Sequence, residues 1–154
     1  LRTGDYAQAA ARLEQSLARY QAWGDQRYIA DVLDAQGRLA LAQGDCAGAR
    51  RSFGASLHLR RLMADKHGIA ESLERHAGCD LSAEVSVRLL AAAETLRHII
   101  GAPLPPIERE EHTLLLDKAR QTLGEQAFAA LWAEGQTLSI EQALALVEAQ
   151  LVMA

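Results

Sequence analysis

The sequence predicts an all-α fold of antiparallel helix hairpins, and three observations carry this prediction. Alanine and leucine dominate the 49% of apolar residues, whereas aromatic residues make up only 5%, so the core is expected to come from helices. Runs of β-branched residues, which favour strands, are missing. Gly-Asp pairs recur every twenty residues, at 4–5, 24–25 and 44–45. The length of 154 residues fits a single domain.

The Gly-Asp pairs predict where one helix stops and the next one starts. Glycine ends a helix because it adopts the left-handed conformation without a Cβ clash, and aspartate caps the following helix by accepting a backbone N–H bond. Gly24-Asp25 and Gly44-Asp45, continued by Ala64-Asp65, therefore separate helices of about 17–19 residues. Gly4-Asp5 is likewise expected inside a hairpin turn. Residues 1–3 would then be the tail of another helix, and the chain a piece of a longer protein.

An internal repeat of forty residues supports this division. When 4–43 is set over 44–83, eleven positions are identical, and most of them are turn or apolar positions. Such selectivity is typical of a repeated structural unit, because only packing and turns must recur. A third, degenerate copy aligns at 87–102, with Ser82 as the cap. Its spacing is three residues shorter, which predicts that the helix after Asp65 ends near Ala77-Gly78.

The pattern changes after residue 100. The segment 101–106, "GAPLPP", predicts an extended connector because proline disfavours helix. Three helices are expected after it: one closed by Gly124, one closed by Gly135, and a last one in which Ser139 and Gln142 form a capping box. In that last helix one face is expected to carry the apolar residues Ile140, Leu144, Val147 and Leu151. The predicted organisation is thus helical repeats over 1–100, the first one truncated, and capping helices over 101–154, packed as one domain.

The repeat resembles the tetratricopeptide repeat (TPR). The residues that carry the resemblance are Leu33, Gly37, Gly44-Asp45, Ala49, Phe53 and Ser56-Leu57, and again Gly4-Asp5-Tyr6, Ala9, Leu13 and Ser16-Leu17. Gly37 and Ala49 would let two helices approach closely, and Phe53 would fill the gap between them. The resemblance implies a TPR-like α-solenoid with a C-terminal helical cap. The period of forty also fits HEAT-type repeats, which remain the alternative fold.

Segment 91–144 is similar to the C-terminal end of large bacterial regulators that carry a signalling ATPase before a helical array. Some of these end in LuxR-type or winged-helix DNA-binding domains, and others carry a cyclase domain. The resemblance implies a regulatory scaffold for signal transduction that senses an inducer or a protein partner. Two cysteines are too few for a disulfide framework, so a cytoplasmic, reducing compartment is expected. Two alternatives stay open: a structural or oligomerising module, with a homodimer formed through exposed repeat ends near Leu13 and Leu17, and a free-standing TPR adaptor.

In tetratricopeptide repeats the first helix of each pair lines a concave face, so the resemblance also implies a binding groove. Its candidate residues are Asp31, Asp34, Arg38, Glu71 and Glu74. Acidic residues recur at matched positions of two repeats, which suggests a groove for a basic peptide or a cationic ligand. Ordinary solvated helix surface is the alternative interpretation.

Other chemistry is weakly indicated. The net charge is −4, and the short basic cluster formed by Arg50, Arg51, Arg60 and Arg61 is interpreted as a solvated helix face, so direct nucleic-acid binding is not expected. His76 and Cys79 lie one helical turn apart without a second pair, so a buried thiol is favoured over a metal site. No phosphate-binding loop or nucleophile motif occurs, and we expect neither an enzyme nor a cofactor. Trp23 is expected to pack at a turn and Trp132 in the core of the capping helices.

Overall fold

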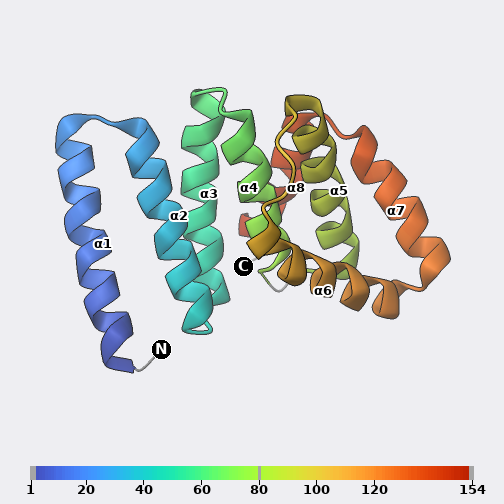
Figure 1. Ribbon diagram of the computed structural model, residues 1–154, viewed down its shortest axis with the longest axis horizontal. Helices are drawn as coiled ribbons and strands as arrows, with labels where there is room; N and C mark the ends of the chain where they lie inside the picture. Colours follow the sequence, from blue (N-terminus) through green and yellow to red (C-terminus); the bar gives the residue numbers. More distant parts are fainter. Residues whose placement is uncertain (1–2, 80, 153–154) are drawn as a thin grey trace. The chain divides into compact units, whose positions relative to one another are not determined.

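The computed structural model describes residues 3–79 and 81–152, and within them the chain is helical apart from short turns and linkers (Figure 1). Those residues contain no strand, so the predicted all-α class is confirmed. The chain forms two compact units, 1–65 and 66–154. The first contains α1 (Thr3–Trp23), α2 (Gln26–Ala42) and α3 (Cys46–Leu62). The second contains α4 (Lys66–Ala77), α5 (Ala83–Ile100), α6 (Pro106–Leu123), α7 (Glu125–Thr137) and α8 (Ile140–Val152).

The predicted division into repeats over 1–100 and a cap over 101–154 stays a prediction. Helices from both sides of residue 100 belong to the second unit. Among the described residues, no helix combines the length and the apolar character needed to cross a membrane.

In the first unit, α2 packs between α1 and α3, and neighbouring helices run in opposite directions (Figure 1). The α2–α3 interface is the tighter of the two, and its centre is Phe53, which is fully buried. A Cβ added to Gly37 would lie 2.9 Å from the Cζ of Phe53 and still closer to other ring atoms. Ala49 on α3 is also fully buried. The close approach expected from small residues around one ring is therefore present.

Three turns, two between helices of this unit and one after α3, share the same backbone hydrogen bonds. The residue with positive φ donates to the carbonyl three positions back, and the following aspartate donates five positions back. The φ values are 71° at Gly24, 79° at Gly44 and 52° at Ala64. The side chains of Asp25 and Asp45 then cap α2 and α3, as predicted, by accepting backbone N–H bonds of 3.3 and 2.8 Å.

The turn expected at Gly4-Asp5 is not observed. Helix α1 already begins at Thr3, so both residues lie in its first turn. An aspartate in a first turn is favoured there by the helix dipole, and Asp5 occupies that position. The predicted helical tail at 1–3 cannot be compared in full, because Leu1 and Arg2 lie outside the described residues.

In the second unit, α5 is the central helix and contacts α4, α6, α7 and α8. Its sequence is apolar on several sides, as a helix surrounded by others requires. Val87, Leu89, Leu90, Ala91 and Ala93 on α5 are fully buried. Helix α4 ends at Ala77, which confirms its predicted shortness.

Helix α5 has the predicted cap at its N-terminus. Ser82 caps the helix by accepting a 3.4 Å bond from the N–H of Val85. At the other end Gly101 takes a left-handed φ of 64°. Residues 101–105 then form a non-helical linker, and α6 begins at Pro106, within the predicted connector. Helix α6 ends before Gly124, as expected.

The prediction that Gly135 closes a helix is wrong, because α7 continues to Thr137. Gly135 is buried inside α7 and lies against α5. A Cβ at this position would lie 2.6 Å from the carbonyl oxygen of Arg88 and 2.7 Å from the Cβ of Ala91. Gly135 therefore serves the close contact of two helices rather than a helix end.

Helix α8 starts with the predicted capping box. The Ser139 N–H donates to Oε1 of Gln142 at 2.9 Å, and the Gln142 N–H donates to Oγ of Ser139 at 3.2 Å. Leu144 and Val147 are buried on the expected apolar face. The side chain of Leu151, which was assigned to the same face, lies outside the described part of the chain.

Candidate functional site

Three of the predicted groove residues lie on α2 in the first unit. Asp34 is buried, and its Oδ2 lies 3.3 Å from Nε of Arg38, one helical turn away. Asp31 is more exposed, and its Oδ1 accepts a 3.1 Å bond from Nη2 of Arg60. Both aspartates therefore already have a cationic neighbour within the chain, which lowers the free negative charge on this face of α2.

Arg60 contradicts the interpretation of the basic cluster at 50–61 as a solvated face. Its side chain is 7% exposed. Nε donates to Oγ of Ser56 at 3.1 Å, and Nη1 lies 3.7 Å from Oδ2 of Asp65. Together with the bond to Asp31, these contacts connect α2, α3 and the turn after α3. Sequence spacing cannot reveal this role, because two of the partners come from other elements.

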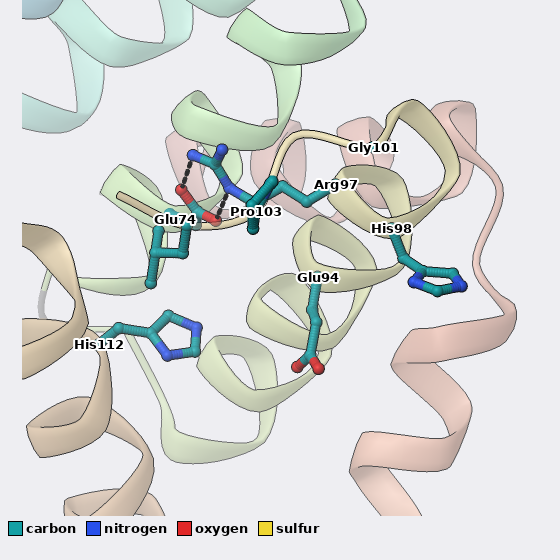
Figure 2. Close-up of a pocket in the computed structure, with 8 residues that line it drawn as sticks. Glu74, Glu94, Arg97, His98, Gly101, Pro103 and His112 are labelled. Carbon is teal, nitrogen blue, oxygen red and sulfur yellow. Dashed lines mark hydrogen bonds and ion pairs between the residues drawn. The ribbon is translucent and has the colours of Figure 1, made fainter. Parts of the chain in front are cut away.

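The other two groove candidates lie on α4 in the second unit. Oε1 of Glu71 lies 3.8 Å from Nδ1 of His67 on the same helix. Glu74 forms a bidentate ion pair with Arg97 of α5. Nε of Arg97 donates to Oε1 at 2.6 Å, and Nη2 of Arg97 donates to Oε2 at 2.8 Å (Figure 2). That hydrogen bonding to Glu74 raises the pKa of Arg97, against the opposite effect of burial. The common groove of α2 and α4 residues stays a prediction.

Glu74 and Arg97 line a pocket of about 440 Å³ that is open to solvent. We call it the linker pocket, because residues of the linker 101–105 form part of its wall (Figure 2). Its lining residues come from α4, α5, the linker and α6, and they are Glu74, Glu94, Arg97, His98, Gly101, Pro103, Leu104 and His112. A volume of this size is in the usual range for small-molecule sites, about 300–1,000 Å³.

Three polar side chains of the linker pocket have no partner among the described residues. Glu94 and His98 extend from successive turns of α5, and the ring of His112 extends from α6 (Figure 2). Within the part of the chain that the structure describes, their side chains make no hydrogen bond or ion pair. No group of three or more His, Cys, Asp or Glu side chains in that part is arranged to hold a metal ion. These three side chains thus line the pocket without a protein partner in the described residues.

The linker that borders the pocket is fixed at both ends. Nη1 of Arg97 donates to the carbonyl of Ala102 at 3.3 Å, and Nε of Arg109 on α6 donates to the carbonyl of Leu104 at 3.1 Å. Arg75 on α4 and Glu108 on α6 form a further ion pair of 3.1 Å. The pocket wall is therefore held in place by side chains of the helices that it joins.

His76 and Cys79 are buried and engaged by backbone carbonyls. Nδ1 of His76 lies 2.8 Å from the carbonyl oxygen of Ser72, and the thiol of Cys79 lies 3.3 Å from that of Arg75. Cys79 is fully buried, in agreement with the favoured interpretation of a buried thiol.

The expectation for Trp23 is wrong, whereas that for Trp132 is partly met. Trp23 is 74% exposed and touches Tyr20 only edge-on, while Tyr20 stacks on Tyr28 across the α1–α2 turn. Trp132 is half-buried and stacks on the buried Phe128, with 5.8 Å between the ring centroids.

Sequence reasoning missed the polar groups of the linker pocket other than Glu74. One signal was present, since Glu94 and His98 are four residues apart and so share a helix face. The contribution of His112 depends on the direction of the linker, which the sequence does not specify.

The chain is similar to part of a class of HTH-type transcriptional regulators. Relatives named in this way come from Mycobacterium bovis and from two strains of Mycobacterium tuberculosis, and each is 33% identical to the chain over 116 residues. The match covers 75% of this chain but 13% of each relative, so the chain spans a small part of their length. No protein-family model matches the chain, and no solved structure gives a significant match.

Proposed function

We propose that this chain is a ligand- or partner-binding regulatory scaffold within a larger bacterial transcriptional regulator. The observation that carries the proposal is the 33% identity to HTH-type transcriptional regulators over three quarters of the chain. The proposed role is to sense a small inducer or a protein partner in the cytoplasm and to pass that state to an effector domain. We propose neither catalysis nor direct contact with nucleic acid for this chain.

A TPR-like α-solenoid is the architecture that we propose for this role. The pairing of α2 with α3 and of α4 with α5 supports it, because these are the most closely packed helix pairs of their units. The contact of Gly37 with Phe53 also supports it. Solenoids of this kind present side chains from successive repeats on one extended surface, which suits recognition rather than chemistry.

A binding role needs a surface with unsatisfied groups, and the linker pocket supplies one. Glu94, His98 and His112 are polar and without partners in the described residues. Among the described residues, the pocket lining contains no serine, threonine, cysteine or lysine, so the hydroxyl, thiol and amine nucleophiles of covalent catalysis are not offered there. This composition favours a binding site over an active site.

The test is a comparison of transcripts in the native host. One strain carries the unaltered gene, and the other carries an in-frame deletion of the codons for residues 66–154, with an immunoblot to verify that the remaining protein is retained. We expect a defined set of transcripts to change in the deletion strain. An unchanged transcript profile in growing, starved and stressed cells would refute the regulatory role.

The main alternative is a structural or oligomerising module. Leu13 and Leu17 on α1 are half-buried, and their free surface could contribute to a dimer contact. Light scattering of the purified chain distinguishes the two cases. A stable dimer together with an unchanged transcript profile would favour the structural module.

A further inference from the structure

We propose that the linker pocket binds a ligand whose recognised part is a primary ammonium group on an apolar body. The inference rests on the proposed function, since it names the chemical class of the sensed ligand. It is argued from the charges that remain free in the pocket, from the apolar part of its wall, and from the way in which the linker is held.

The first step is that Arg97 is not available to an anion. Its side chain is 4% exposed. Nε and Nη2 donate to the two oxygens of Glu74, and Nη1 donates to the carbonyl of Ala102. All three nitrogens therefore have partners within the chain. A carboxylate or phosphate ligand would have to displace Glu74, which would leave that carboxylate uncompensated.

The second step is that Glu94 carries the unpaired charge. Among the lining residues of the linker pocket, the formal charges at neutral pH are those of Glu74, Glu94 and Arg97. Glu74 and Arg97 neutralise each other. Glu94 has no ion pair within the described residues, so the lining keeps a formal charge of −1, with the histidines counted as neutral. A cation complements that charge.

The third step concerns the hydrogen bonds that a primary ammonium group can make. It has three donors and no acceptor, as the lysine side chain does. Glu94 offers carboxylate acceptors, and a neutral imidazole offers one acceptor nitrogen. His98 on α5 and His112 on α6 lie on different sides of Glu94 (Figure 2), and no three His, Cys, Asp or Glu side chains of the described residues are grouped closely enough to hold one ion. The Glu94 carboxylate is therefore the acceptor that the ammonium group uses. A quaternary ammonium group lacks N–H donors and would not make this hydrogen bond.

The fourth step concerns the body of the ligand. Pro103 and Leu104 contribute apolar surface to the same pocket as Glu94. The linker that carries them is held by the bonds from Arg97 and Arg109. Because this wall is already ordered, an apolar group can be buried against it with little further loss of conformational freedom. An aryl or alkyl chain of a few carbons would fit this arrangement.

The test uses the full 154-residue chain and a matched series of small probes. The probes are 2-phenylethylamine, its neutral analogue 2-phenylethanol and the anionic analogue 3-phenylpropanoate. Binding is followed at neutral pH by the amide ¹H–¹⁵N signals, with Gly101 and Leu104 as reporters in the linker. We expect these signals to shift and the amine to bind about two- to fivefold more tightly than the alcohol, as an exposed ion pair allows. The carboxylate should bind most weakly.

A pair of charge-removing variants locates the preference. Glu94→Gln should abolish the difference between amine and alcohol. Glu148→Gln removes the same charge from an exposed position of α8 outside the pocket, and it should preserve the difference. A further probe is an acetylated and amidated Phe-Lys dipeptide, whose ammonium group belongs to a lysine side chain. Its binding, compared with that of the free amine, shows whether the pocket prefers a lysine of a protein partner or a small amine. Binding of either one supports the ammonium site.

Several outcomes would overturn the inference. These are equal binding of amine and alcohol, tighter binding of the carboxylate, no shift at Gly101 or Leu104 with millimolar amine, and an amine preference that survives Glu94→Gln. If transcripts respond to the deletion of 66–154 while the amine fails to bind, the ligand class is wrong and the regulatory role stands. If the amine binds and transcripts do not change, the regulatory role is wrong.

Discussion

Replacement of Gly135 by alanine is expected to destabilise the second unit, although the same change inside an ordinary helix is stabilising. Gly135 lies within α7, where alanine has a helix propensity advantage of about 1 kcal/mol. The added Cβ, however, would lie 2.6 Å from the carbonyl oxygen of Arg88 and 2.8 Å from its Cα. These are backbone atoms of the central helix α5, so no side-chain rotation can remove the contact.

The magnitude follows from these two opposing effects. Overpacking in a close-packed interface costs about 1–3 kcal/mol, and the upper part of this range applies when backbone must move. Subtraction of the propensity gain leaves a net loss of about 1–2 kcal/mol. With a urea dependence of about 2 kcal/mol/M, the midpoint of unfolding should fall by about 0.5–1 M. Without the steric contact it would rise by about 0.5 M.

Trp132 provides the assay, because it lies in α7 and stacks on Phe128. Its fluorescence is followed during urea unfolding in a Trp23→Phe background, which removes the exposed tryptophan of α1. Gly78→Ala is the matched control in the same unit, since its nearest added contacts are 3.5 and 3.9 Å, and it should raise the midpoint by about 0.2–0.5 M. A higher midpoint for Gly135→Ala than for the unaltered chain would refute the close contact of α7 with α5.

Three further predictions concern other contacts. Gly37→Ala should lower the free energy of unfolding by about 1–2 kcal/mol because its Cβ meets the Phe53 ring; in thermal unfolding, the double variant with Phe53→Leu should lose less than the sum of the two single losses. Glu74→Gln should cost about 2–3 kcal/mol in urea unfolding, because it leaves the buried guanidinium of Arg97 without its counter-charge. Hydrogen bonds to the Glu84 carboxylate, first from its own backbone N–H, lower its pKa. Its contribution to stability is therefore present above the unfolded-state pKa and is lost as the pH falls through the folded-state pKa. The Glu84→Gln variant should be less stable than the unaltered chain at neutral pH and should lose less stability in an acid titration. Equal losses in the two proteins would contradict this.

The elements that the sequence predicts well are those whose causes are local. Gly24-Asp25 and Gly44-Asp45 specify their turns because a left-handed residue and a capping carboxylate act within five residues of chain. The capping box at Ser139 is equally local. The turn at Ala64 is equally local although it lacks glycine. The twenty-residue spacing of the Gly-Asp pairs predicts its position, and it has the same backbone hydrogen bonds as the other two turns.

The features that the sequence does not predict depend on which helices meet. Gly135 looks like a helix end by composition, and only the position of α5 explains why a small residue is needed within α7. Arg60 looks like surface charge until Asp31 and Asp65 are brought to it from other elements. The linker pocket is of the same kind, because it combines residues from three helices and a connector.

The three equivalent turns at Gly24, Gly44 and Ala64 are closed by main-chain hydrogen bonds. The two helices between them, α2 and α3, have the same length of 17 residues. An inserted residue in α2 between Gly37 and the turn at Gly44 would rotate that turn and α3 by about 100° around the helix axis relative to Gly37. Gly37 would then turn away from Phe53 while the next bend still formed. Over evolutionary time such a chain should accept amino-acid substitutions readily but resist insertions and deletions within its helices. Related sequences should therefore differ in residue identity while the number of residues between successive turns stays the same.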